Sequence, residues 1–157
     1  MTFRISDDLE QLETFFPYQL AVAAERFSRD LMEVYNKTYG LTREEWRLLF
    51  LLSREGQIAS NELAQRTTLD KVQLSRASQR LADKGLITRN VSPKDRRLKL
   101  YQSTEKGRAL FAEIKPQVDA RASDIVSSMS KEQKAALQMG LNGLLEALGA
   151  PEQMFGD

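Results

Sequence analysis

The sequence predicts a mainly α-helical protein with one small β-hairpin. Apolar residues recur at three- and four-residue steps over most of the 157 residues, which is the period of amphipathic helices. Between residues 86 and 102 the period shortens to two around a turn-forming segment, which indicates two antiparallel strands. Several helical segments are preceded by a capping residue with Glu or Gln three positions later. These features set the limits of the elements described next.

Two helices are expected before residue 40. Residues 1–16 indicate a short helix that begins after the capping run Ser6-Asp7-Asp8. A longer helix follows from Pro17, whose missing N–H suits a first helical turn, and Gly40 ends it. Its apolar stripe is broad and rich in aromatic residues, so it belongs either to a core or to a partner surface.

Residues 42–69 predict two further helices. Thr42 and Glu45 have capping-box spacing ahead of an apolar stripe that ends before residue 56. Ser60 is expected to cap a second, shorter helix that ends in a turn at residues 67–69. The segment 57–59 serves only as the link between the two helices.

The run from 71 to 83 predicts a basic helix with two faces. Asp70 and Gln73 have capping-box spacing at its start, and Lys84-Gly85 is a stop signal. One face carries hydrogen-bond donors and positive charge, the groups that reach base edges in a major groove. The apolar positions are Val72, Leu74, Ala77 and Leu81. Because a helix, a short turn and a second basic helix form a helix-turn-helix, we predict that 71–83 is a DNA recognition helix.

Residues 86–91 and 98–102 form the predicted hairpin. The loop between them contains Lys94, Arg96 and Arg97. An Arg-tipped hairpin beside a helix-turn-helix is a wing, and its arginines can enter a minor groove or contact phosphates. Thr104 then caps a long helix in which Pro116 should produce a kink, and Ser130 caps a last helix that ends near Gly149. The tail 151–157 is expected to be mobile.

The composition argues against an enzyme. The chain has no Cys and no His, which excludes thiol chemistry, disulfides, His or Cys metal sites and His-activated nucleophiles. The acidic pairs Asp7-Asp8 and Glu44-Glu45 lie at predicted helix starts, where negative charge interacts favourably with the helix dipole. This structural role explains them without acid–base catalysis. We therefore expect no cofactor and no metal. Because no apolar run approaches about 18 residues and no signal peptide opens the chain, we expect no membrane partner and a cytoplasmic location.

Positive charge is concentrated in the middle of the chain. Residues 66–97 contain nine basic and three acidic residues, a net charge of +6, whereas the whole chain carries +1. Such a segment is either a solvated helix face or a nucleic-acid surface. The adjacent helix-turn-helix and wing favour DNA.

A set of short motifs runs through most of the chain. They are Leu41-Thr42, Trp46 with Leu49 and Leu52, Glu62-Leu63-Ala64, Leu69-Asp70-Lys71, Ser75-Arg76, Leu81, Lys84-Gly85-Leu86-Ile87-x-Arg89, Asp95-Arg96-Arg97 and Thr104-x-Lys106-Gly107. With these motifs the sequence resembles the MarR/SlyA family of winged helix-turn-helix transcriptional regulators, over about residues 17–148. One departure is Ser103, where the family usually has Leu, and we expect it to loosen the second wing strand slightly.

The resemblance implies a homodimer in which the first helix and the last two helices of each subunit intertwine. The expected organisation is an N-terminal dimerisation region (1–40), a winged helix-turn-helix lobe (41–104) and C-terminal dimerisation helices (105–150). A two-fold dimer presents recognition helices roughly 34 Å apart, which predicts a palindromic operator on double-stranded DNA. In this family such a regulator is more often a repressor.

The candidate DNA contacts lie on the recognition helix and the wing. We predict that Gln73, Ser75, Arg76 and Gln79 face the major groove, with Arg76 the best candidate for a bidentate contact to guanine. Ser60, Lys71 and Arg80 are predicted phosphate contacts. Arg96, with Lys94 near it, is predicted to enter a minor groove. The resemblance suggests that Asp95 pairs with Arg97 to shape the turn, although Arg97 could instead contact phosphate.

The resemblance also implies an effector, because family members commonly bind small aromatic or phenolic acids between the dimer helices and the DNA lobe. The residues that could line such a cleft are Phe15, Phe16, Tyr18, Phe27, Tyr39, Trp46 and Phe111, with Arg26 or Arg47 for a carboxylate. These aromatics could instead be dimer core. Two other functions stay open: a winged-helix module for protein–protein contact, and an architectural DNA-binding protein that responds to no effector.

Overall fold

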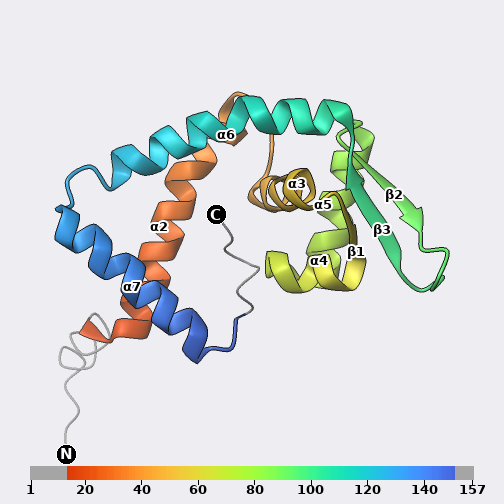
Figure 1. The fold of residues 1–157 in the computed structure, drawn as a ribbon. Coiled ribbons are helices and arrows are strands. Elements are labelled where there is room, and N and C mark those ends of the chain that lie inside the picture. Colours follow the sequence, from red (N-terminus) through yellow and green to blue (C-terminus); the bar gives the residue numbers. More distant parts are fainter. Residues whose placement is uncertain (1–13, 151–157) are drawn as a thin grey trace, which may run out of the picture.

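The computed structural model describes residues 14–150, which form six helices and three strands (Figure 1). The helices are α2 (Phe16–Lys37), α3 (Arg43–Glu55), α4 (Ser60–Thr67), α5 (Lys71–Asp83), α6 (Glu105–Ile125) and α7 (Lys131–Ala147). The strands are β1 (Gln57–Ala59), β2 (Ile87–Val91) and β3 (Lys99–Ser103). The helix predicted within residues 1–16 lies largely outside the described residues, and so does the tail. Among the described residues, no helix has the length and apolar character needed to cross a bilayer.

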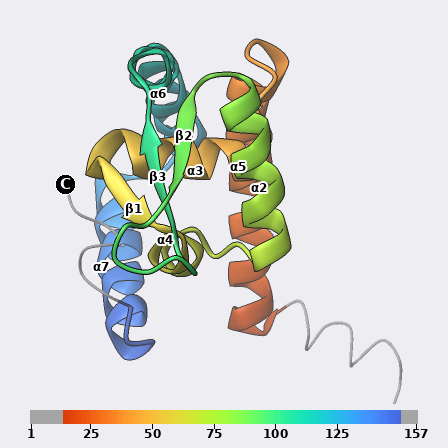
Figure 2. The same cartoon turned by 90° about the vertical axis from the view of Figure 1, so that its right-hand side faces the viewer.

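The elements form a compact lobe and an extended helical part (Figure 1). Helices α3, α4 and α5 surround a small sheet, and the β2–β3 hairpin projects from the lobe. Helix α6 begins at the base of this hairpin, packs against α2, and leads to α7 at the far end. The view in Figure 2 looks onto the hairpin, with α5 beside it. The predicted fold class, mainly α with a small β wing, is confirmed.

The sheet contains one strand that the sequence did not reveal. The order is β1-β3-β2, all antiparallel, and Tyr101 of β3 pairs with Ile58 on one side and Arg89 on the other. The hairpin agrees with the prediction to within a residue or two at each strand end. The segment 57–59, expected only as a link, is strand β1. Three residues are too few to show a period of two, so its pairing depends on β3 alone.

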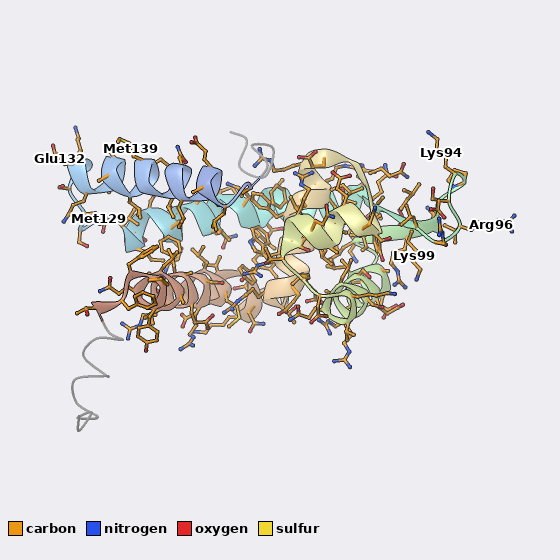
Figure 3. The ribbon with its side chains drawn as sticks, turned by 90° about the horizontal axis from the view of Figure 1, so that it is seen from below. Lys94, Arg96, Lys99, Met129, Glu132 and Met139 are labelled. Atoms are coloured by element: carbon orange, nitrogen blue, oxygen red, sulfur yellow. The ribbon has the colours of Figure 1, made fainter. Side chains whose placement is uncertain are left out.

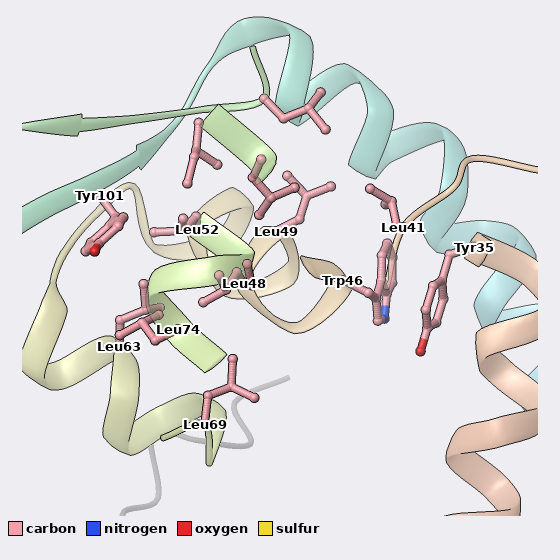
Figure 4. Close-up of a cluster of buried hydrophobic side chains, with 14 of the residues drawn as sticks. Tyr35, Leu41, Trp46, Leu48, Leu49, Leu52, Leu63, Leu69, Leu74 and Tyr101 are labelled. Atoms are coloured by element: carbon pink, nitrogen blue, oxygen red, sulfur yellow. The ribbon is translucent and has the colours of Figure 1, made fainter. Parts of the chain in front are cut away.

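Leucines make up about half of the buried core, nine of its 17 residues, and six of these nine lie on the three lobe helices (Figure 4). Leu48, Leu49 and Leu52 of α3 are wholly buried, and they share one cluster with Leu63 of α4 and Leu81 of α5. The prediction that Val72 belongs to the apolar face of α5 is wrong, because its side chain is 57% exposed. The buried positions 74, 77, 78 and 81 follow the helical period, and residue 72 lies off that face.

Most predicted helix starts are confirmed. Thr42, Asp70 and Ser130 each form a capping box with the residue three positions later. Thr104 caps α6, which continues through Pro116 as one helix. The prediction that Ser60 is an N-cap is wrong. The helix already begins at Ser60, and its hydroxyl accepts a bond from the Lys99 N–H (3.3 Å), so it joins α4 to the sheet instead.

The base of the wing is held by a set of short contacts. Ser103 does not loosen this region as expected, because it is buried and donates to the Leu52 carbonyl (3.0 Å). The next residue, Thr104, donates its N–H to the Leu86 carbonyl (3.0 Å) and its hydroxyl to the Gly85 carbonyl (2.7 Å). These bonds fix the start of α6 against the start of β2.

Candidate nucleic-acid interface and ligand pocket

Helix α5 packs on the core through one face and leaves its opposite face exposed to solvent. Leu74, Ala77 and Leu81 face the core, and the Asp70–Gln73 capping box orders the first turn, with an Asp70 carboxylate oxygen 2.8 Å from the Gln73 nitrogen. Gln73, a predicted groove contact, is therefore also part of the cap. Arg76 and Ser75 are exposed, and Arg76 has no hydrogen-bond or ion-pair partner among the described residues.

Two of the predicted DNA contacts on α5 have partners inside the lobe. The Gln79 amide donates to Asp83 (2.7 Å) and accepts from the Arg89 guanidinium on β2. Arg80 donates from Nε to the Glu45 carboxylate (3.1 Å). These tertiary contacts join the recognition helix to the wing and to α3, and sequence spacing alone gave no sign of them.

The wing turn is shaped by a pairing that the resemblance suggested. The Asp95 carboxylate accepts from the Arg97 backbone N–H (3.0 Å) and from its guanidinium (3.2 and 3.4 Å). These bonds lower the pKa of the Asp95 carboxyl. The Ser92 hydroxyl accepts from the N–H groups of the next turn residues, Lys94 and Asp95. As a result Lys94 and Arg96 extend from the tip of the hairpin (Figure 3).

A basic hollow lies between α5 and the wing. It has a volume of about 430 Å³, and its lining combines hydroxyl and amide groups with three cations. Its ten lining residues include Ser60, Lys71, Ser75, Arg97 and Lys99, together with apolar side chains such as Leu74. Four of these are predicted DNA contacts brought together from three segments. Lys99 was missed. Alternation along β3 places it on the same face as the buried Tyr101 and Ser103, and it is exposed because it lies at the outer end of the strand.

Glu45 is the residue whose role the sequence most understated. It was interpreted as favourable charge at a helix start, yet it is fully buried and accepts bonds from Arg80, Lys84 and the Thr42 backbone N–H (2.7 Å). Its capping-box position was visible in the sequence. Its two cationic partners, Arg80 on α5 and Lys84 just after that helix, could not be seen in the sequence, because they lie 35 and 39 positions further along the chain.

A second, mostly apolar cavity of about 580 Å³ lies between α2, α3 and the C-terminal helices. Of the predicted effector residues, Phe27, Trp46 and Arg47 line it. Tyr35 and Arg43 also line it, and sequence reasoning missed both. Tyr35 stacks on Trp46 with ring centroids 5.2 Å apart (Figure 4).

The remaining predicted effector residues lie elsewhere. Tyr18 and Arg26 line a separate hollow along α2. Phe15 and Phe16 are exposed, and Tyr39 donates its hydroxyl to Glu113 (2.9 Å). Phe111 packs on the Trp46 ring at 5.6 Å as part of the aromatic core.

The cavity lining carries positive charge. The Arg43 guanidinium bonds to the Glu25 carboxylate (3.0 Å), and this bond together with Arg29 lowers the pKa of Glu25. The Arg43 Nε is buried without a hydrogen-bond partner, and Arg47 reaches the Thr68 hydroxyl (3.5 Å). An anionic group entering the cavity would therefore find two guanidinium groups and apolar rings, which suits an aromatic acid. The described residues contain no cluster of acidic side chains that could hold a metal ion.

A helix-turn-helix, an Arg-tipped hairpin and a basic hollow between them define a winged helix-turn-helix DNA-binding protein. A sequence model of the MarR family matches residues 39–98. The HTH-type transcriptional regulator MhqR of Bacillus subtilis (strain 168) is 30% identical over 110 residues, which are 70% of this chain and 76% of MhqR. The chain belongs to the MarR family of transcriptional regulators and is not an enzyme.

Solved structures of similar proteins share the fold. A MarR transcriptional regulator from Methanosarcina mazei Go1 has a TM-score of 0.75 and 25% identity, covering 85% of this chain and 95% of that one. NadR, solved in complex with 4-hydroxyphenylacetate, has a TM-score of 0.66 and 26% identity, covering 80% and 89%.

Proposed function

We propose that the protein is a homodimeric repressor that acts in the cytoplasm on a palindromic operator and is released by a small aromatic acid. The observation that carries the DNA part is the exposed, unpartnered guanidinium of Arg76 on the outer face of α5. Arg96 at the wing tip would enter a minor groove, and the basic hollow between α5 and the wing would lie along the DNA backbone. Ser75 and Gln73 are the further candidates for contacts in the major groove. The candidates for phosphate contacts are Lys71, Ser60 and Arg97.

The proposed dimer is supported by apolar surface on the long helices. No residue of α7 is buried, and Leu137, Met139 and Leu148 are 47%, 76% and 72% exposed. Phe15, Phe16 and Tyr18 at the start of α2 are exposed as well. Exposed large apolar side chains on a helix that buries no residue of its own, such as α7, favour a protein–protein interface. A two-fold dimer would use the same surface on both subunits and present its two α5 helices to successive major grooves of DNA.

Replacing Arg76 with alanine tests the DNA assignment. On duplexes selected from a random pool, we expect Arg76→Ala to cost about 1–3 kcal/mol of binding free energy and to relax preference at one base position. Arg96→Ala serves as the contrast, because it should weaken binding to all duplexes and reduce the slope of log K against log salt. Fluorescence anisotropy on selected and scrambled duplexes measures both. If Arg76→Ala binds each duplex as the parent does, Arg76 is not a base contact.

The effector part of the proposal is supported by the cavity beside Trp46 and by the cations Arg43 and Arg47 that line it. NadR, which has the same fold, was solved with 4-hydroxyphenylacetate. In this chain a carboxylate would compete with Glu25 for Arg43 or bond to Arg47. Because the cavity lies between the long helices and α3, an occupant would favour one arrangement of the lobe relative to the dimer helices.

A panel of aromatic acids tests the effector. We expect 4-hydroxyphenylacetate, or another acid of similar size, to raise the melting temperature, change Trp46 fluorescence and weaken duplex binding by about 5- to 150-fold. The corresponding uncharged amide is the matched control. It should change the melting temperature and duplex affinity much less, because it has no carboxylate to pair with Arg43 or Arg47. A panel in which no acid changes either stability or duplex affinity would remove the support for an effector.

A further inference from the structure

Glu45 holds a buried negative charge directly behind the recognition helix. Its side chain has no exposed surface, although it lies only three positions into α3. One carboxylate oxygen accepts from Arg80 Nε (3.1 Å) and Lys84 Nζ (3.2 Å), and the other accepts from the Thr42 N–H (2.7 Å) and again from Lys84 (3.3 Å). A buried carboxylate needs such partners, because an unpaired one would carry a large desolvation cost.

The two cations that Glu45 binds differ in how many of their hydrogen-bond donors are already used. Lys84 is fully engaged, because its ammonium also donates to the Gly40 carbonyl (3.2 Å). Arg80 uses only its Nε, its side chain is 45% exposed, and its terminal nitrogens have no partner among the described residues. One edge of the guanidinium therefore faces Glu45 and the remaining donors face outward.

Arg80 also lies on the face of α5 that carries Arg76. The two residues are four positions apart, so they are neighbours one turn apart on the same helix surface. The single negative charge of Glu45 is shared by two cations, so this site keeps a net positive charge. A guanidinium fixed through Nε presents a preformed fork to a phosphate with less side-chain entropy to lose on binding.

We propose that Glu45 is a positioning residue for DNA binding: it fixes Arg80 through Nε so that the terminal nitrogens face a backbone phosphate, and it binds the Lys84 ammonium through both carboxylate oxygens. This inference depends on the proposed DNA-binding role of the α5 face. It adds a buried acidic residue of α3, 35 positions before Arg80 in the chain, that would influence DNA binding through Arg80 without touching the DNA.

Salt-dependent binding to a selected duplex, measured with the full chain, tests the proposal. Arg80→Ala should remove one phosphate contact in each subunit, two in the proposed dimer, which lowers the salt slope by about 1.8 and the affinity by about 60-fold near 0.1 M salt. Glu45→Gln should shift both values most of the way to those of Arg80→Ala. The glutamine oxygen can still accept the Thr42 N–H, so the cap of α3 is retained. In the double variant, Glu45→Gln should add no further loss to that of Arg80→Ala.

Two further variants keep the test decisive. Glu55→Gln breaks an ion pair with Arg66 (2.9 Å) elsewhere in the lobe, and it should leave affinity and slope at the parent values. Arg80→Lys keeps the charge but has a single ammonium to divide between Glu45 and phosphate, so it should bind like Arg80→Ala even if Glu45→Gln folds poorly.

The outcomes distinguish a failure of the proposed DNA-binding function from a failure of the proposed role of Glu45. A parent protein that binds no duplex in a salt-dependent way would contradict the proposed function itself. If the parent binds but Glu45→Gln raises the salt slope, Glu45 withholds Arg80 from DNA and the positioning role is wrong. Losses from Glu45→Gln and Arg80→Ala that multiply in the double variant would reduce Glu45 to a structural residue and also overturn the inference.

Discussion

Replacing Gly107 with alanine is expected to destabilise the protein by about 2–6 kcal/mol. A Cβ built at this position lies 2.1 Å from the Leu86 carbonyl oxygen and 3.0 Å from its carbon. The obstacle is backbone, so no rotamer change relieves it and the start of α6 has to move away from β2. Such overpacking costs about 1–3 kcal/mol. The movement also threatens the two Thr104 bonds to Leu86 and Gly85, at about 0.5–1.5 kcal/mol each.

Urea unfolding followed by far-ultraviolet circular dichroism measures this loss. Gly143→Ala in α7 is the matched control, since a Cβ there meets no atom within 4 Å. That change should leave stability unchanged or raise it by about 0.5–1 kcal/mol, because alanine favours a helix interior. Both proteins should be measured at one concentration, as α7 belongs to the proposed dimer surface. An unfolding midpoint for Gly107→Ala equal to that of the parent would show that the wing base tolerates the added methyl group.

Local signals in the sequence were sufficient to predict most of the fold. A capping box involves residues three positions apart, so Thr42, Asp70 and Ser130 could be identified from spacing alone. The hairpin was predictable because two strands joined by a short turn need no distant partner. Strand β1 was not, because its three residues are held only by pairing with β3 more than 40 positions away. Ser60 shows the same limit, since its hydroxyl bonds to β3 rather than to its own helix.

The candidate site shows the same division between local and distant contacts. The exposure of Arg76 follows from its helix face and was predicted from periodicity, whereas the Asp95–Arg97 pairing was suggested by the family resemblance. The partners of Glu45 and the stacking of Tyr35 on Trp46 depend on how separate helices meet. Sequence periodicity predicts that a residue faces the core, but it does not predict which residue from another helix it contacts. Arg43, which was not among the predicted effector residues, lines the cavity for this reason.

Replacing Trp46 with alanine is the second change with a large expected effect, a loss of about 3–5 kcal/mol in the free energy of unfolding. The indole is only 8% exposed and packs against three other rings, those of Tyr35, Phe50 and Phe111. Aromatic pairs contribute about 0.5–1.5 kcal/mol beyond their buried area. Removing the ring therefore opens a void next to the existing cavity and leaves the other three rings without their shared neighbour.

Trp46 is the only tryptophan in the chain, so its removal abolishes tryptophan fluorescence and stability has to be followed by circular dichroism. Trp46→Phe retains an aromatic ring at the junction and should lose clearly less stability than Trp46→Ala. Because Trp46 belongs both to the cavity lining and to the lobe core, the phenylalanine variant also separates two effects. If it stays folded and binds the selected duplex but no longer responds to an aromatic acid, the ring serves the cavity as well as the core. If Trp46→Ala is as stable as the parent, the aromatic cluster contributes little to the packing of α3 against α2 and α6.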